Sequence, residues 1–320
     1  MKTKKKQVLE LWKTAFDDSD KFTRLYFERV YRDENALVIE RDGEILSALQ
    51  MLPYTMTFCG EEISVAYISG ACTLPSEQGK GLMTQLLRNS FEEMRNRGIA
   101  LTALIPAEKW LFDYYRRQGY TEIFEYSLNV YTRHEYIKPE RDLYVSLVDG
   151  KQDESCYEYV NKKLRERPAC ILHTYDDFIT ILKDLKISKG KCVAAYDKEN
   201  HLVGMAFVTP PGKKQIPGSV IIKEILFDDE RVKRHLLFEI TKHFKVFKAV
   251  YRIPFNDGPI TYPYGMARVI DCEYLVDLWS ETHPGSNVTT DDMKSMDVRA
   301  LTSHLFGYRN KTAYMSLMLD

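Results

Sequence analysis

The segment Gln78-Gly79-Lys80-Gly81 separates a strand-like apolar run, 63–73, from a run with helical spacing that starts at Leu82. A short loop of this kind presents successive backbone N–H groups at a helix N-terminus, where the helix dipole also favours anions. The two glycines carry no Cβ, so the backbone can approach a phosphate closely. The sequence therefore predicts a binding site for a phosphorylated ligand at this loop.

Two common nucleotide motifs do not fit the loop. A Walker loop needs G-x-x-x-x-G-K-[ST], but Leu74 and Gly81 stand where its first glycine and its hydroxyl residue belong. A dinucleotide fingerprint needs a third glycine where Thr84 stands, and an acidic residue at the end of the strand predicted at 99–105. A nucleotide-binding domain is therefore only an alternative hypothesis, for which ATP or NAD should raise the melting temperature.

The loop resembles the Q/R-x-x-G-x-G/A signature of the GNAT superfamily of N-acyltransferases, with Met83 where Gly or Ala is usual. The resemblance implies acetyl-CoA as co-substrate, its pyrophosphate bound by the loop backbone. It also implies splayed strands, with the end of the run at 63–73 beside the thioester and the pantetheine. The cofactor-binding residues implied are Ala71, Cys72, Thr73, Gln78, Gly79, Lys80, Gly81, Leu82 and Met83.

The same resemblance supplies candidate catalytic residues. Tyr115, four residues before Gly119, stands at the position of the family's general acid, and an ordinary tyrosine pKa near ~10 would keep its proton until a thiolate forms. Tyr114 is the alternative. Cys72 suggests a covalent route, but no histidine lies near it in the sequence and the superfamily usually transfers directly, so we interpret Cys72 as structural.

The general base and the acceptor site are less defined. Residues 65–73 contain no Asp or Glu, which leaves water or the chain's C-terminal carboxylate on Asp320, a group that Eis-like relatives deliver toward the active site. The family's acceptor pocket lies against the first two helices. Candidate substrate-binding residues there are Asp17, Asp18, Asp20 and Tyr26. A capped helix start with solvated charges explains the three aspartates equally well.

The elements that must position these residues follow from periodicity. Helices are predicted at 8–16 and after the aspartates, followed by strands at 36–40, 45–51, 54–58 and 63–73, a helix from 82 to Gly98, a strand at 99–105, a helix at 108–118 and strand structure at 120–131. A second series contains helices near 153–165 and 175–185, strands at 192–196, 203–209 and 220–227, a helix at 230–244 and a strand at 247–253. The second series repeats the order of the first.

This layout resembles the Eis-like (enhanced intracellular survival) tandem acetyltransferases. The resemblance implies an α+β fold with two GNAT-like mixed-sheet domains, a catalytic one at 1–135 and a degenerate one at 136–255. Residues 256–320, entered through 266–271, would form a shortened sterol-carrier-like α+β module. The second domain's equivalent segment has no glycine and carries Asp228, Asp229 and Glu230, so we expect no acyl-CoA site there.

Composition narrows the function further. The 320 residues carry a formal net charge of -1, which gives no electrostatic reason to expect nucleic acid or an anionic membrane as partner. Six scattered cysteines without a C-x-x-C pair argue against structural zinc, and no metal is expected. The prediction is a cytoplasmic acetyltransferase for a small-molecule or peptide amine, and the resemblance to Eis-like proteins allows a homo-oligomer. The alternative is a non-catalytic acyl-CoA-binding regulatory protein.

Overall fold

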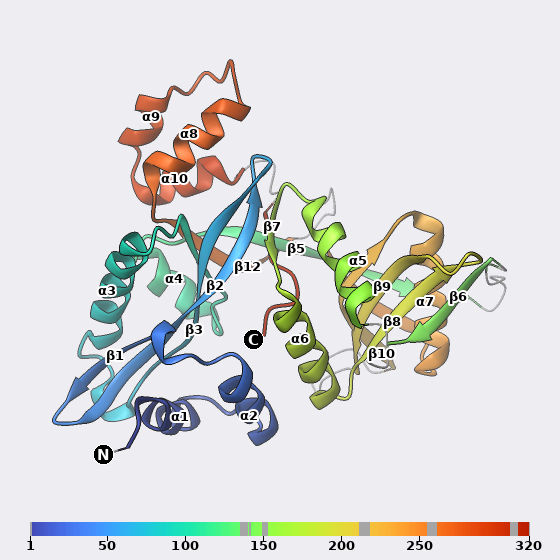
Figure 1. The fold of residues 1–320 in the computed structure, drawn as a ribbon, viewed down its shortest axis with the longest axis horizontal. Helices are drawn as coiled ribbons and strands as arrows, with labels where there is room; N and C mark the ends of the chain where they lie inside the picture. The colour runs from blue at the N-terminus through green and yellow to red at the C-terminus, as the bar shows by residue number, and fades with distance from the viewer. Residues whose placement is uncertain are drawn as a thin grey trace. The chain divides into compact units, whose positions relative to one another are not determined.

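The computed structural model describes residues 2–134, 140, 142–148, 153–210, 218–254, 261–307 and 313–319. By internal contacts the chain divides into a first unit, Met1–Phe124 with Pro263–Ala313, and a second unit, Glu125–Tyr262 with Tyr314–Asp320. Figure 1 shows the elements coloured along the chain. The predicted division into three domains at 135 and 255 stays a prediction.

The first unit begins with two short amphipathic helices, α1 (Lys4–Ala15) and α2 (Asp20–Arg29). Each starts at a hydroxyl N-cap: Thr3 accepts a hydrogen bond from the backbone N–H of Lys6, and Ser19 from that of Phe22. Their buried faces are aromatic, and the rings of Trp12 and Tyr26 lie 4.5 Å apart between centroids. This pair of helices was predicted, and α1 begins four residues earlier than its apolar stripe.

An antiparallel meander follows, built from β1 (Ala36–Arg41), β2 (Glu44–Phe58) and β3 (Glu61–Thr73). Tight turns at Asp42-Gly43 and Cys59-Gly60 join these strands, with positive φ at all four residues. The separate strands predicted at 45–51 and 54–58 are wrong. Pro53 pairs with Ala66 inside one continuous β2, and β1 pairs with β2 only as far as Gln50, so the proline interrupts no β1 hydrogen bond.

A strand–helix–strand unit then carries the glycine loop. It consists of β3, a short 3-10 turn η2 (Pro75–Glu77), α3 (Leu82–Asn96) and β4 (Leu101–Leu104), with β4 parallel to β3. Helix α4 (Lys109–Arg116) comes next. Leu86, Leu87, Phe91 and Met94 of α3 pack against Leu49, Met51, Ala66 and Ile68 of the sheet. The loop therefore follows the third strand, not the fourth.

The segment from Pro263 completes the first unit. Its strand β12 (Thr261–Val269) pairs antiparallel with β4, and the helices α8 (Cys272–Thr282), α9 (Thr290–Ser295) and α10 (Val298–Leu305) follow. Arg268 Nη1 donates to the carbonyl oxygen of Gln118 at 2.9 Å. Gly119 has a φ of 86°, which other residues rarely adopt, and a Cβ there would displace that same nitrogen, at 1.7 Å. Neither β12 nor α9 was predicted from the sequence.

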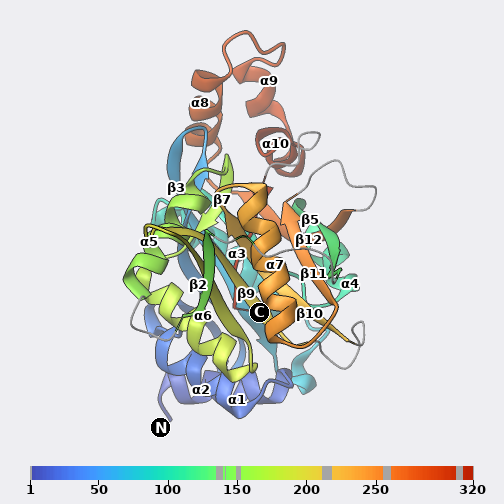
Figure 2. The ribbon, with the colours of Figure 1, turned by 90° about the vertical axis from the view of Figure 1, so that its right-hand side faces the viewer.

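The second unit repeats the same order of elements. Its sheet runs β5-β11-β10-β9-β8-β6, and parallel β10 and β11 flank α7 as β3 and β4 flank α3. Figure 2 shows α7 beside these strands. The bounds are β5 (Thr121–Thr132), β6 (Leu143–Leu147), α5 (Asp153–Arg165), β7 (Ala169–Leu172), α6 (Tyr175–Ile187), β8 (Lys191–Asp197), β9 (Leu202–Thr209), β10 (Ser219–Phe227), α7 (Glu230–His243) and β11 (Lys248–Pro254).

Residues 314–319 belong to the second unit, and 314–318 are buried. The short strand β13 (Ala313–Tyr314) lies next to β7. The Ser316 hydroxyl donates to the carboxylate of Glu224, which also receives a bond from Arg167 Nη2 at 3.2 Å. His173 Nε2 lies 2.6 Å from the carbonyl oxygen of Ser316. These contacts hold the C-terminal segment in place. Within the described part of the chain, none of the helices has the length and apolarity needed to cross a membrane.

Candidate functional site

The glycine loop has the backbone conformation that its sequence predicts. Gly79 and Gly81 have φ of 77° and 82°, in the left-handed region that non-glycine residues rarely adopt. A Cβ built on either glycine would meet no atom within 4 Å. The glycines are therefore required for the turn itself, and the side of the loop on which a Cβ would stand is open.

Helix α3 starts without a side-chain cap. Gly81 is its N-cap residue, and its first turn carries no acidic residue. The equivalent helix of the second unit, α7, is capped by Asp229, whose carboxylate accepts a bond from the backbone N–H of Val232 at 2.8 Å. The N-terminus of α3 therefore offers N–H groups and a helix dipole to an external anion, whereas α7 meets this need with its own carboxylate.

The charged and polar side chains of the loop are tied to their neighbours. Lys80 Nζ lies 2.9 Å from the carboxylate of Glu77, which also lies 3.4 Å from Arg41 Nη1. The Lys80 contact lowers the pKa of Glu77. Gln78 Nε2 donates to the carbonyl oxygen of Thr73 at 3.3 Å and so connects the loop to the strand end. With Lys80 partly neutralised, the loop backbone carries most of the attraction for an anion.

Strands β3 and β4 separate at their C-terminal ends. They pair only from Val65 opposite Leu101 to Tyr67 opposite Ala103, while β3 continues to Thr73. Residues 68–73 of β3 thus have no β4 partner in the ladder and leave backbone groups on that edge for another molecule. This unpaired edge belongs to the strand that leads into the glycine loop, so an extended ligand with its phosphates at the start of α3 could pair with it.

A β-bulge distorts β3 beside this gap. Ala48 pairs with Cys72 and Gln50 with Ser69, so Gly70 and Ala71 stand opposite Leu49 alone. Gly70 has a φ of 60°, which other residues rarely adopt, and a Cβ there would lie 2.3 Å from Trp12 Cζ3. The backbone conformation and the close contact with Trp12 therefore both require glycine at this position. Beyond the bulge, the Ser47 hydroxyl lies 2.8 Å from that of Thr73. Ala71, Cys72 and Thr73 form the end of the open edge.

The Cys72 thiol is poorly suited to nucleophilic attack. Burial raises its pKa to about 12, so the thiolate is scarce at neutral pH. Its residue is 5% exposed and lies on the Tyr26 side of the sheet. These properties agree with the interpretation of Cys72 as a structural residue.

The two tyrosines of α4 have different surroundings. Tyr115 is buried in the core formed with α3, its ring 5.7 Å from that of Tyr120, and burial raises its pKa. The ordinary pKa assumed from the sequence is therefore too low. Tyr114 is half-buried, and its hydroxyl lies 3.2 Å from that of Thr84 in the first turn of α3. Thr84 was not among the predicted site residues, because only the fold brings α4 against the start of α3.

The acidic residues before α2 have local partners. Asp18 Oδ2 accepts a bond from the Trp12 indole at 2.9 Å, and Asp20 Oδ1 lies 3.3 Å from Lys13 Nζ, while Asp17 is exposed. Tyr26 is buried and its hydroxyl donates to Ser69 Oγ at 2.8 Å. The structure thus brings Tyr26 to the bulged strand and leaves the aspartates at the surface. Their role in acceptor binding stays a prediction.

A polar side chain that the sequence did not single out lies on the same face as Ser69. Gln50 is 1% exposed, and neither its Oε1 nor its Nε2 has a hydrogen-bond partner within the described residues. Leaving a buried polar group unpaired costs about 1–3 kcal/mol. No sequence signal marked this residue, because a single glutamine in an apolar run reads as a solvent-facing position of an alternating strand.

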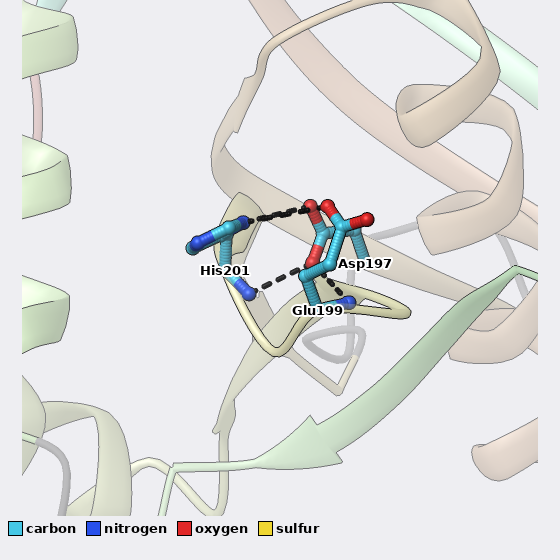
Figure 3. A group of neighbouring side chains, drawn as sticks. All are labelled: Asp197, Glu199 and His201. Carbon is cyan, nitrogen blue, oxygen red and sulfur yellow. Dashed lines mark hydrogen bonds and ion pairs between the residues drawn. The ribbon is translucent and has the colours of Figure 1, made fainter.

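Asp320, the candidate general base, lies outside the described residues. In the second unit, Asp197, Glu199 and His201 gather their ligand atoms within 4.8 Å of one another (Figure 3). Asp197 Oδ1 accepts bonds from the backbone N–H groups of Glu199 and His201 at 2.9 and 2.8 Å. This group closes the turn between β8 and β9, and its contacts explain it as turn geometry.

Comparisons with known proteins identify the fold around this loop. Residues 1–123 match the family model described as an acetyltransferase (GNAT) domain, and no curated protein matches the chain. A probable N-acyltransferase of Enterococcus faecalis V583 shares 16% identity at a TM-score of 0.70, over 86% of this chain and 72% of that one. A GCN5-related N-acetyltransferase of Kribbella flavida shares 17% identity at a TM-score of 0.67, over 85% of this chain and 70% of that one. Eis1 of Mycobacterium abscessus shares 13% identity at a TM-score of 0.62, over 85% of this chain and 72% of that one.

At these identities the solved structures show the fold, and the family model shows the domain. The predicted α+β class, with two tandem GNAT-like units, is confirmed. Residues 1–123 therefore match a GNAT acetyltransferase domain, and the chain shares the fold of Eis1 of Mycobacterium abscessus.

Proposed function

We propose that the first unit is an N-acetyltransferase that uses acetyl-CoA and acts on a primary amine, small or peptide-borne. One observation carries the proposal: the uncapped N-terminus of α3 follows the glycine loop, and the loop follows the part of β3 that does not pair with β4. Phosphates bound at the N–H groups of Gly79 to Met83 would let the pantetheine extend along residues 71–73. The proposed reaction uses no metal and involves no nucleic acid or membrane surface. We assign it to the cytoplasm, and the proposal allows a homo-oligomer.

The proposed reaction is direct transfer. The amine nitrogen attacks the thioester carbon, a C–N bond forms and the C–S bond breaks. The nitrogen loses one proton to water or to the C-terminal carboxylate of Asp320, and the departing thiolate takes a proton from Tyr115. Because the raised pKa of Cys72 keeps its thiol protonated, a route through an acetylated cysteine is disfavoured.

The decisive experiment measures coenzyme A release from acetyl-CoA in the presence of a panel of primary amines. Turnover that depends on both substrates, with the product identified by mass, is the expected result. Binding of acetyl-CoA without turnover of any amine would favour the alternative, a non-catalytic acyl-CoA-binding protein. A rise in melting temperature with ATP or NAD, and not with coenzyme A, would contradict both.

Replacement of the two tyrosines separates the catalytic from the packing role. Tyr115→Phe should lower kcat by about 10²-fold or more, because general-acid assistance is typically worth 10²–10⁴. Tyr114→Phe, the matched control on the same helix, removes only the contact with Thr84 and should change kcat by less than about tenfold. The KM for acetyl-CoA should not change in Tyr115→Phe.

The pH profile gives a second test of Tyr115. Burial raises the Tyr115 pKa, so the hydroxyl keeps its proton and the kcat of the wild-type protein should not fall between pH 7 and 9.5. Equal kcat in Tyr115→Phe and the wild-type protein would exclude Tyr115 as the acid.

A further inference from the structure

The unpaired amide of Gln50 is the starting point. Both its polar atoms are buried without a partner in the described structure, and its neighbour across the strands is Ser69, the residue at the bulge. Directly opposite residues of an antiparallel pair project to the same face of the sheet. Ser69 Oγ already accepts a bond from Tyr26 on α2, so the Gln50 side chain belongs to the face that α1 and α2 cover.

The opposite face is occupied by α3. Leu49 and Met51, the two neighbours of Gln50 in β2, pack with the α3 residues Leu86 and Leu87. A donor whose phosphates bind at the start of α3 and whose pantetheine follows the open edge of β3 enters from the α3 side. The nucleophile must then approach the thioester from the α1 and α2 side, where Gln50 and Ser69 lie.

We propose that Gln50 is the residue that positions the acceptor amine, an inference that rests on the proposed function. Its Oε1 accepts a hydrogen bond from an amine N–H, and its Nε2 donates to an oxygen of the same acceptor. The acceptor class is therefore a primary amine with a neighbouring hydroxyl or carbonyl oxygen, rather than an alkyl polyamine.

The chemistry of the side chain supports an amide over a carboxylate at this position. A carboxylate stabilises an ammonium ion and raises its pKa, which lowers the fraction of the neutral amine that can attack. An amide oxygen binds either form and favours the charged one much less. Residues 65–73 of β3 also carry no acidic side chain, so the bulged strand adds no negative charge. The site thus holds the amine while leaving its lone pair for the thioester.

The test is Gln50→Met, which keeps the length of the side chain and removes both polar atoms. Since the amide is unpaired in the free protein, the melting temperature should rise by about 2–4 °C. The kcat/KM for an amine with a neighbouring oxygen should fall at least about tenfold, towards that of a plain alkylamine, while the KM for acetyl-CoA stays unchanged. Thr302→Val is the control. Thr302 is equally buried but accepts from the backbone N–H of Val269 at 3.1 Å, so this variant should melt lower and keep its amine kinetics.

Two results would overturn the inference. A lower melting temperature in Gln50→Met would mean that the amide has a structural partner, and unchanged amine kinetics would mean that it contacts no acceptor. If the wild-type protein turns over no amine, the proposed function fails separately. Whether Gln50 binds an amine can then be tested by measuring how far an amino alcohol raises the melting temperature in the presence of coenzyme A. Loss of that shift in Gln50→Met supports the amine site, and an equal shift in both proteins rejects it.

Discussion

Gly81→Asp should reduce the affinity of the first unit for coenzyme A by at least about 100-fold, equivalent to about 2.7 kcal/mol. The substitution puts a carboxylate at the uncapped start of α3, where the phosphates are expected, and like charges repel there. A Cβ at this glycine meets no protein atom within 4 Å, so the effect falls on the ligand rather than on packing. Isothermal calorimetry with coenzyme A measures the change.

The matched control is Gly43→Asp in the β1–β2 turn. Gly43 has a φ of 80° against 82° for Gly81, and its Cβ also meets nothing within 4 Å. It therefore carries the same backbone strain and the same added charge, and should bind coenzyme A normally. Unchanged affinity in a folded Gly81→Asp would contradict the loop assignment.

The wild-type protein should bind one coenzyme A per chain, because Asp229 caps the equivalent helix of the second unit. A calorimetric stoichiometry of two would show that the second unit also binds coenzyme A.

The second large effect is expected at the buried ion pair of the second unit. Arg167→Met should lower the unfolding free energy by about 3–5 kcal/mol, since it leaves the carboxylate of Glu224 charged and 1% exposed. The guanidinium also lies 4.0 Å from the centre of the Tyr314 ring, so the C-terminal segment loses this cation–π contact as well. Urea unfolding measures the loss, and proteolysis after residue 313 should become faster.

A second variant separates charge from packing. Arg167→Met combined with Glu224→Met removes both charges and should recover most of the lost stability, because a buried ion pair replaced by apolar side chains of similar volume is often close to neutral. Arg231→Met is the control for an exposed pair. Arg231 lies 2.5 Å from Asp142 with both side chains more than 40% exposed, so water screens this pair and Arg231→Met should leave the urea midpoint close to that of the wild-type protein. A loss below 1 kcal/mol in Arg167→Met would show that the Glu224 charge is compensated by other groups.

The sequence by itself determined the local elements and the loop. Helical and alternating periodicities located α3, α5 and α7 closely, and Gly79 and Gly81 specified a left-handed turn before α3. These features depend on neighbours within a few residues, so a single chain segment contains the information. The repeated strand–helix–strand order was equally visible, because each copy carries its own period change.

Only the tertiary structure decided which distant residues meet. The pairing of β12 with β4, the bulge at Gly70 that sets Gln50 opposite Ser69, and the burial that raises the Tyr115 pKa all depend on strands and helices brought together by packing. Two strands were predicted at 45–51 and 54–58, yet long-range pairing with β3 makes them one continuous β2. Local propensity is worth tenths of a kcal/mol to about one per residue, whereas burial of a large apolar side chain is worth about 1.5–3 kcal/mol, so packing overrides the local signal where the two disagree.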